Sequence, residues 1–315
     1  MQRDFISIVT PVYGDKKLVK MLYDAIVKSM SHLDVDFEIV MVCDACPYGS
    51  ADEIRKLALE DKRVKFINLS RNYGQHLAIK AGLDNATNKG VGSYTVVMDC
   101  DLQDNPDDII KFYNKIKETN ADVVFGDRKQ REVGGLKKLH SVLANKLIRS
   151  LSDFSIDETR NCGNFSIFKN NVLTVLQNAK EPYFVFGYLI ANAGFAIEYV
   201  DIVQEERPVG HSGYNFFKGI KHMLRILVNN SNKPLLFSVV CAFIMFILCM
   251  LFILKLIIGY FVYGTSVEGW TSIMVAIFFI ASLVFVHLGL MSLYIGQIFK
   301  LAQNRPLYNV RERIN

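Results

Sequence analysis

The stretch Val96-Val-Met-Asp-Cys-Asp-Leu-Gln-Asp104 joins a short apolar run to a group of acidic residues. The apolar run has the length and composition of a buried β-strand, and Asp99 and Asp101 follow it directly. Alternate residues of an extended chain face the same way, so these two carboxylates can address one site. Paired carboxylates suit a divalent cation that also takes oxygens from a diphosphate. A solvated turn would show the same triplet, but the position directly after a strand favours a metal and nucleotide site.

The residues around this stretch alternate between β-rich runs and helical patterns. Strands are expected at residues 5–10, 37–43, 64–69, 93–98 and 121–125, and helices at residues 16–30, 75–85 and 106–119. Pro11 is expected to stop the first strand, and Ser50 with Glu53 has the form of a capping box that opens a further short helix. This alternation predicts an α/β fold with a mostly parallel sheet, in which ligands bind at the carboxyl ends of the strands.

The other expected strand ends also carry polar residues. Thr10-Pro-Val-Tyr13 ends the first strand, and Asp44 closes the second. At that edge Asp44 can accept hydrogen bonds from a base or a ribose, although a turn cap is an equal alternative for this residue. Arg71 follows the third strand within Ser70-Arg-Asn-Tyr-Gly74, where its position favours anion binding over a plain surface charge.

The C-terminal third of the chain contains two long apolar runs, at residues 235–262 and 270–299. Each exceeds the roughly 20 residues that a helix needs to cross a hydrocarbon core. Lys255 alone interrupts the first run, and no Asp, Glu, Lys or Arg falls within the second. Two buried core helices are the alternative, but such length without a polar face argues against them. We therefore expect transmembrane helices at residues 234–263 and 270–299 and a lipid bilayer as a partner.

The charge pattern around these runs predicts the orientation of the chain. Residues 211–233 combine an apolar face with Lys218, Lys221 and Arg225, which is typical of an amphipathic helix in the headgroup layer. A core helix packed on the sheet is the alternative there. Cations flank both ends of the hairpin, and no secretory signal precedes the first strand. We expect a multi-pass protein of the cytoplasmic membrane, with a catalytic domain at residues 1–210 and a basic tail at 300–315 that are both cytoplasmic.

The six cysteines suggest reduced thiols. Cys43 and Cys46 have the C-x-x-C spacing, but no second pair lies at the distance of a zinc site. A loop that contains two thiols is therefore the better interpretation than a redox or metal site.

Four segments together resemble family 2 glycosyltransferases with the GT-A fold, and more narrowly the polyprenyl-phosphate glycosyltransferases. These segments are Thr10-Pro-Val-Tyr13, Leu69-Ser-Arg-Asn-Tyr-Gly74, Met98-Asp-Cys-Asp-Leu-Gln-Asp104 and Gly126-Asp-Arg128. The resemblance runs through nearly the whole chain, because bacterial members of this group also end in two membrane helices.

The resemblance implies a donor site on the nucleotide side. Asp44 would contact uracil or an equivalent base. Asp99, Asp101 and Gln103 would hold Mg²⁺ or Mn²⁺ together with the nucleotide diphosphate. The remaining donor-site residues would be Thr10, Pro11, Tyr13 and Arg71.

The resemblance also implies an acceptor site. Arg128, after the fifth strand, would bind the lipid phosphate together with Arg131, and Arg207 would close on phosphate groups. The family often reads G-D-F-R where this chain has Gly163-Asn-Phe-Ser166, and Asn164 does not serve as a base. A phosphate monoester is already charged near neutral pH, with a second pKa near ~6, so it needs positioning and charge shielding more than a base. Asn164 would then orient the acceptor or a sugar hydroxyl.

A second departure is Ser212-Gly-Tyr214, where the family often reads S-K-Y, so one expected cation is missing. The sequence as a whole predicts a metal-dependent, inverting transferase that moves a sugar from a nucleotide sugar to undecaprenyl or dolichyl phosphate. The expected donor is UDP-linked. The resemblance implies a tetramer. We do not expect a nucleic-acid partner. One alternative is a processive polysaccharide synthase, although its Q-x-x-R-W motif is absent and the single tryptophan is Trp270. The other is an inactive, membrane-tethered nucleotide-sugar-binding protein.

Overall fold

The computed structural model describes residues 3–14, 16–90, 92–128, 162–181, 184–204 and 269–315, together with scattered residues between 235 and 262. The chain divides into two compact units. The first comprises residues 1–134, 154–212 and 306–315, and the second comprises residues 135–153 and 213–305. The first unit therefore includes both ends of the chain.

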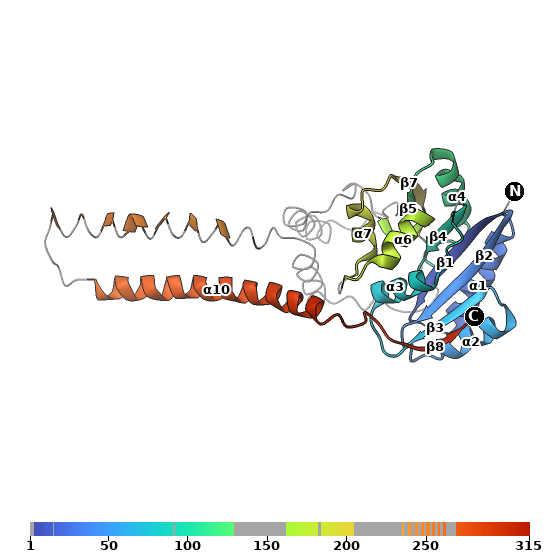
Figure 1. Cartoon of the computed structure of the whole chain (residues 1–315), viewed down its shortest axis with the longest axis horizontal. Coiled ribbons are helices and arrows are strands. Elements are labelled where there is room, and N and C mark those ends of the chain that lie inside the picture. Colours follow the sequence, from blue (N-terminus) through green and yellow to red (C-terminus); the bar gives the residue numbers. More distant parts are fainter. Residues whose placement is uncertain are drawn as a thin grey trace. The chain divides into compact units, whose positions relative to one another are not determined.

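The first unit is built on an eight-stranded sheet in the order β7-β5-β6-β4-β1-β2-β3-β8 (Figure 1). Its strands are β1 (Asp4–Val12), β2 (Val35–Cys43), β3 (Val64–Leu69), β4 (Ser93–Val97), β5 (Val123–Arg128), β6 (Cys162–Lys169), β7 (Ile197–Ile202) and β8 (Val310–Ile314). Strand β1 runs parallel to β2 and β4, β2 to β3, and β5 to β7, whereas β6 and β8 are antiparallel to their neighbours. The predicted α/β fold with a mostly parallel sheet is confirmed.

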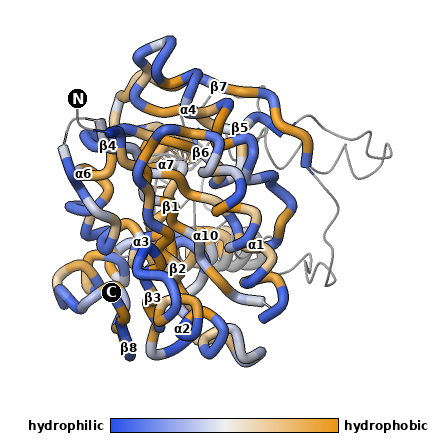
Figure 2. Tube along the Cα trace, turned by 90° about the vertical axis from the view of Figure 1, so that its right-hand side faces the viewer, coloured by the Kyte–Doolittle hydropathy of each residue, from blue (hydrophilic) through white to orange (hydrophobic). Residues whose placement is uncertain are grey.

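Helices cover both faces of this sheet. On one face pack α1 (Lys16–Met30), α2 (Ser50–Glu60) and α4 (Asp108–Thr119), and on the other pack α3 (Gln75–Asn85), α6 (Asn170–Asn178) and α7 (Phe186–Asn192). The period-2 alternation of the strands supplies both cores, because Ile39 and Met41 face the first helix layer while Val40 and Val42 face the second. Hydrophobic residues accordingly run along the central strands (Figure 2).

Two local predictions were wrong. Pro11 does not stop the first strand, because β1 continues to Val12 with Pro11 opposite Val42 of β2. The β1–β4 ladder has already ended at Val9, so on that side the missing N–H of proline breaks no ladder. Ser50 does not cap its helix either. It is the first helical residue, follows Gly49 at the cap, and uses its hydroxyl to bind the Gly14 carbonyl.

The C-terminal residues, expected as a basic tail, form strand β8 at the edge of the sheet. Val310 lies opposite Leu69 of β3, and Ile314 lies opposite Phe66. The pairing is antiparallel and shifts register between Asn68 and Leu69. The chain therefore leaves the first unit after β7 and returns to complete the same sheet.

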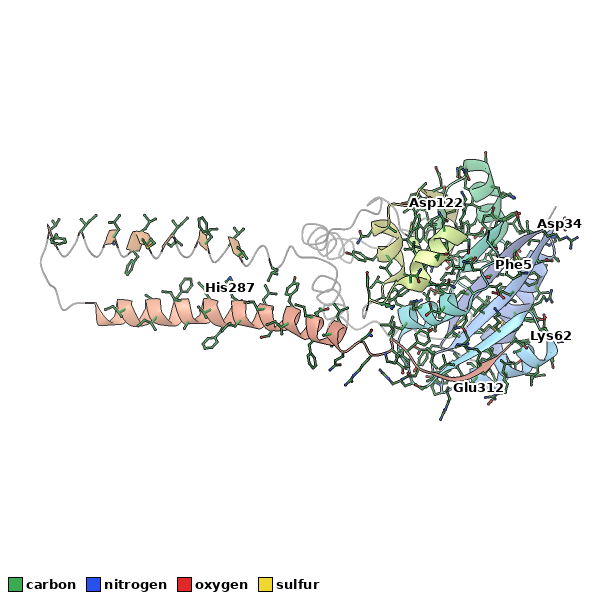
Figure 3. The ribbon with its side chains drawn as sticks, viewed as in Figure 1. Phe5, Asp34, Lys62, Asp122, His287 and Glu312 are labelled. Carbon is green, nitrogen blue, oxygen red and sulfur yellow. The ribbon has the colours of Figure 1, made fainter. Side chains whose placement is uncertain are left out.

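The second unit contains α10 (Trp270–Ala302), a helix of 33 residues. At ~1.5 Å per residue it exceeds a ~30 Å hydrocarbon core. Among the described helices, one stretch, Phe279–Ala302, is long and apolar enough to cross a membrane, and none of it is buried. His287, labelled in Figure 3, lies on this helix and is half-buried, with its Nδ1 atom 2.7 Å from the Leu283 carbonyl oxygen. Every described residue between 235 and 262 is helical, whereas the predicted amphipathic helix at 211–233 lies outside the described residues.

Candidate active site

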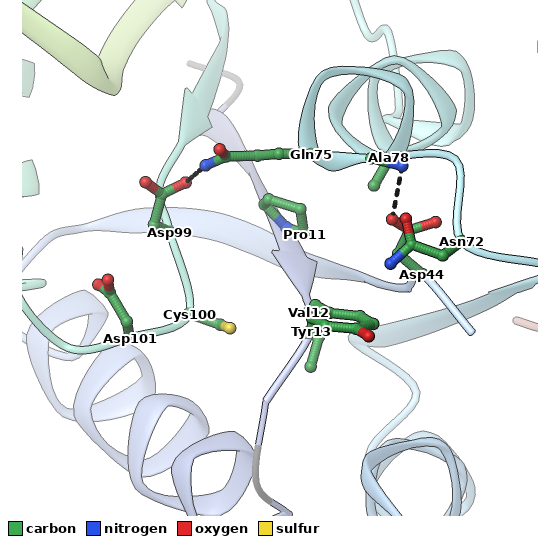
Figure 4. A pocket seen from close by; sticks show the side chains of 11 residues that line it. Pro11, Val12, Tyr13, Asp44, Asn72, Gln75, Ala78, Asp99, Cys100 and Asp101 are labelled. Carbon is green, nitrogen blue, oxygen red and sulfur yellow. Dashed lines mark hydrogen bonds between the residues drawn. The ribbon is translucent and has the colours of Figure 1, made fainter. Parts of the chain in front are cut away.

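A cleft of about 360 Å³ opens at the carboxyl ends of β1, β2 and β4. It is lined by Pro11, Val12, Tyr13, Asp44, Asn72, Gly74, Gln75, Ala78, Asp99, Cys100 and Asp101 (Figure 4). Five residues predicted for the donor site, Pro11, Tyr13, Asp44, Asp99 and Asp101, are thus brought together. The parallel strands cause this, because they deliver the loops that follow them to one edge of the sheet.

Asp99 and Asp101 face the same cleft from the turn that follows β4. Protein atoms desolvate the Asp99 carboxylate, and this burial together with the charge of Asp101 raises the pKa of Asp99 to about 6. Gln75, in the first turn of α3, opposes that shift by donating a hydrogen bond of 2.6 Å from Nε2 to Asp99 Oδ1. Two neighbouring carboxylates that face one cleft are chemically suited to a cation.

The donor set fits a metal that completes its coordination with oxygens from a ligand. The described residues hold no group of three or more His, Cys, Asp and Glu side chains able to bind an ion by themselves. Mg²⁺ in particular is often bound by one or two carboxylates together with substrate phosphates. The structure places Gln103 differently from Asp99 and Asp101, because it is not among the lining residues and its backbone N–H donates to Asp101 Oδ1 at 3.2 Å. Its assignment as a metal ligand stays a prediction.

Asp44 is almost fully buried at the floor of the cleft, where it is 3% exposed. Its two carboxylate oxygens accept hydrogen bonds from the backbone N–H groups of Tyr73, at 2.7 Å, and Gly74, at 2.8 Å. These bonds tie the end of β2 to the loop that precedes α3. Asp44 therefore organises the cleft wall in this structure, and its predicted contact with a base stays a prediction.

Besides Gln103, two residues predicted for the donor site do not line the cleft, namely Thr10 and Arg71. Thr10 is fully buried within β1, and its hydroxyl has no hydrogen-bond partner among the described residues. Arg71 is exposed and stacks its guanidinium over the Tyr73 ring, with 4.1 Å between the guanidinium carbon and the ring centroid. Both adjoin residues that do line it, namely Pro11 and Asn72.

Arg128 is the last residue of β5 rather than a residue after that strand, because β5 extends beyond its expected end at Phe125. Its guanidinium forms an ion pair of 2.7 Å with Asp104, whose side chain is 1% exposed. Gly163 of β6 leaves the space that the guanidinium occupies, since a Cβ at that position would lie 2.6 Å from the guanidinium carbon. Arg128 is thus locked in place by the final acid of the Met98–Asp104 motif.

The remaining acceptor-site predictions are only partly described. Asn164 is half-buried on β6, next to Gly163, and its carbonyl accepts a hydrogen bond of 3.1 Å from the Ser166 hydroxyl. Arg131 and Arg207 lie outside the described residues. The structure adds three positions that the sequence reasoning did not assign, namely Gln75, Asp104 and Gly163. Asp104 carried a usable signal because it closes the acidic motif, and Gly163 carried one because it keeps the glycine of the family's G-D-F-R segment, whereas Gln75 carried none.

The thiols near the cleft differ in character. Cys46 accepts a hydrogen bond of 3.1 Å from the Gly14 backbone N–H, and a hydrogen bond from Cys43 is the main cause that lowers the pKa of Cys46 to about 6. The same interaction raises the pKa of Cys43, and burial raises that of Cys100. All three cysteines are free in the structure.

The Gln75→Ala variant is expected to bind Mn²⁺ about tenfold more weakly than the wild type. Without the amide, Asp99 loses the hydrogen bond that orients its carboxylate and favours its ionised form. Electron paramagnetic resonance of free Mn²⁺, titrated against the full-length protein at pH 7, measures the change. Asn88→Ala removes an exposed amide that does not line the cleft and serves as the control. Equal Mn²⁺ affinity in the Gln75 variant and the wild type would contradict this role.

Comparison with known proteins identifies the family. The family described as Glycosyl transferase family 2 matches residues 7–186. An uncharacterized glycosyltransferase of Bacillus subtilis, YkcC, is 30% identical, with 97% of this chain and 93% of that protein aligned. The undecaprenyl-phosphate 4-deoxy-4-formamido-L-arabinose transferase of Proteus mirabilis is 28% identical over 98% of this chain and 93% of its own length. The bactoprenol glucosyl transferase of Shigella phage SfII is 27% identical over 98% of this chain and 97% of its own length.

Among solved structures, the mannosyltransferase PcManGT of Pyrobaculum calidifontis, in complex with GDP-Man and Mn²⁺, is similar with a TM-score of 0.46 and 15% identity. The similarity covers 97% of this chain and 89% of that one. The family match spans most of the catalytic sheet, including the whole cleft, and the relatives align along nearly the full chain. The protein is therefore a glycosyltransferase of family 2, with the GT-A type of α/β fold.

Proposed function

We propose that the protein transfers a sugar from a nucleoside-diphosphate sugar, UDP-linked in the first instance, to the phosphate of a polyprenyl phosphate. The relatives named above as undecaprenyl-phosphate and bactoprenol transferases support this acceptor class. The observation that carries the proposal is that Asp99 and Asp101 share one cleft with Asp44 and the first turn of α3.

The geometry of the cleft supports binding of the donor. The first turn of α3 contributes Gln75 and Ala78 to the lining, and Gly74 at the cap of this helix lines it too. The N-terminus of a helix favours negatively charged groups such as a diphosphate. Tyr13 lines the same cleft, and Asp44, which the loop before α3 holds by two hydrogen bonds, is proposed to contact the base or ribose. When bound, Mg²⁺ or Mn²⁺ would neutralise charge on the departing diphosphate. Asp99 and Asp101 are the residues proposed to hold it.

On the acceptor side, the proposed nucleophile is the lipid phosphate, which is already charged and needs to be positioned against the sugar. Arg128 is held rigidly by Asp104 beside Gly163, and we propose that it orients the lipid phosphate. Asn164 lies on the same strand as Gly163 and would orient the acceptor or a sugar hydroxyl. Arg131 and Arg207 are proposed to assist. A single displacement at the anomeric carbon would invert its configuration.

The connectivity supports attachment to the membrane through an even number of crossings. Strand β7 and strand β8 belong to one sheet, so the chain between them leaves that domain and returns to it. If α10 crosses a bilayer, the preceding segment must cross it once in the other direction. The helical residues between 235 and 262 are the proposed second crossing. Under this proposal the connectivity puts the domain and both termini on one side of the bilayer, and the cations that flank the two apolar runs favour the cytoplasmic side. Tetramer formation stays a prediction from resemblance.

Mass spectrometry of lipid products tests the proposal. The purified full-length protein in nanodiscs would be incubated with undecaprenyl phosphate, Mg²⁺ or Mn²⁺, and separately with UDP- and GDP-linked sugars. We expect a polyprenyl monophosphosugar with one donor class and none without polyprenyl phosphate. Absence of any glycosylated lipid across all donors and both metals would refute the proposal. Longer glycan chains on the lipid would indicate a processive synthase instead.

A further inference from the structure

The wall of the cleft proposed to bind the donor includes a short loop that follows β3. This loop, residues 70–74, is called the donor loop below. Asn72 and Gly74 of this loop line the cleft. The backbone N–H groups of Tyr73 and Gly74 hold both carboxylate oxygens of Asp44. The position of the donor loop therefore sets the position of Asp44, and any group that fixes this loop also shapes the nucleotide site.

The C-terminal segment of the chain, residues 306–315, contacts this loop through two hydrogen bonds, both made by Asn309. The Ser70 backbone N–H donates to the Asn309 carbonyl at 2.9 Å, and the Asn309 backbone N–H donates to the Tyr73 hydroxyl at 3.2 Å. The same hydroxyl lies 3.1 Å from Ser70 Oγ. Asn309 immediately precedes β8, so the β3–β8 ladder leads directly into the donor loop.

The C-terminal segment is also fastened to the domain at points away from the loop. Glu312, labelled in Figure 3, accepts two hydrogen bonds from the Arg55 guanidinium, at 2.9 and 2.8 Å. The Asn315 amide donates to the carbonyls of Ala58 and Val64, at 2.7 and 2.9 Å. The Tyr308 hydroxyl donates to Asp84 at 2.8 Å. These anchors hold the segment against α2, β3 and α3 independently of its contacts with the loop.

We propose that Asn309 and the Tyr73 hydroxyl are positioning groups for the donor loop, so that the C-terminal segment shapes the nucleotide site through Asn309 without lining it. None of these C-terminal residues lines the cleft. They follow α10 directly in the chain, so the helix proposed to enter the membrane is joined by a short connection to the wall of the nucleotide site. This inference rests on the proposed binding of a nucleotide in the cleft.

The test compares two variants that each remove one tyrosine hydroxyl from the contact between this segment and the domain. Tyr73→Phe removes the hydroxyl that bonds Asn309 and Ser70 but keeps the ring under Arg71. Tyr308→Phe removes a hydroxyl that bonds Asp84 and does not touch the loop. Deletion of residues 306–315 is a poorer test, because it would leave the edge of β3 unpaired and disturb the whole sheet.

The first measurement needs no nucleotide. Hydrogen exchange of the full-length protein should show faster exchange of the Tyr73 and Gly74 amides in Tyr73→Phe and unchanged exchange in Tyr308→Phe. The second measurement is kinetic. In Tyr73→Phe the KM for the nucleotide sugar should rise about 3- to 10-fold, which is the range for one or two lost hydrogen bonds, while kcat and the KM for polyprenyl phosphate stay unchanged.

The two measurements separate this inference from the proposed function. If Tyr73→Phe exchanges no faster than Tyr308→Phe at these amides, the C-terminal segment does not position the loop, and the inference fails. It also fails if exchange is faster but the KM for the donor is unchanged. A wild-type protein without transferase activity would refute the proposed function, and the exchange comparison would still decide whether the segment positions the loop.

Discussion

The Asp101→Asn variant is expected to transfer sugar about a thousandfold more slowly than the wild type. Asparagine keeps the size of the side chain and can still accept the hydrogen bond from the Gln103 N–H, but it removes one of the two charges that face the cleft. The variant should remain folded, because loss of this charge relieves its repulsion with Asp99. Turnover with a nucleotide sugar and polyprenyl phosphate, together with Mn²⁺ affinity, measures the effect.

A matched control separates loss of the metal site from general disturbance of the cleft. Cys46→Ser replaces a thiol beside Gly14 that does not line the cleft, and it should keep nearly full activity. Thermal unfolding of both variants checks the fold. Wild-type turnover in Asp101→Asn would show that the site is misassigned, and so would a large loss in Cys46→Ser alone.

The Arg128→Met variant is expected to lose both stability and acceptor binding. Removing the guanidinium leaves the buried Asp104 carboxylate without its ion-pair partner, which costs about 3 kcal/mol of unfolding free energy. If Arg128 orients the lipid phosphate, the KM for polyprenyl phosphate should also rise by about 10-fold or more, since a charge-assisted hydrogen bond is lost. Chemical denaturation and steady-state kinetics measure the two effects.

The double variant Arg128→Met/Asp104→Asn distinguishes the two roles of Arg128. It removes the unpaired charge, so most of the lost stability should return. The defect in acceptor binding should remain, because the guanidinium is still absent. Recovery of the wild-type KM for polyprenyl phosphate in the double variant would contradict a direct role in the acceptor site and would leave Arg128 with a structural role alone.

Much of the fold follows from local periodicity. The strands at the centre of the sheet carry apolar residues on both faces, as Ile39 to Val42 do, and such runs are visible without any tertiary information. The helix at Lys16–Met30 repeats its buried residues at helical spacing and was predicted with its observed bounds. The acids of the cleft, Asp44, Asp99 and Asp101, were also predictable. They follow the ends of parallel strands, and such ends lie at one edge of the sheet.

The wrong predictions have non-local causes. Pro11 belongs to β1 because the neighbouring ladder has already ended at Val9. Ser50 turns away from its own helix because the Gly14 carbonyl is within its reach. Strand β8 is short and contains Arg311, Glu312 and Arg313, so its composition resembles a solvated tail. Its strand conformation depends on the free edge of β3, which the local sequence does not reveal.

Non-local contacts also decide which residues orient the side chains of the site. Gln75 reaches Asp99 only because α3 begins next to the end of β4, and Asp104 meets Arg128 only because β5 extends to that residue. Neither pairing follows a fixed spacing in the chain. The sequence therefore predicts which acids face the ligand, but not which neighbours orient them.

The return of the chain to the edge of β3 has a practical consequence for biochemistry on this enzyme. A water-soluble fragment that stops after β7 would lack a strand of its own sheet and the partner of Ser70 and Tyr73. Such a fragment should be rescued by adding residues 306–315 as a separate peptide. Peptide complementation would thus give access to the nucleotide chemistry without detergent.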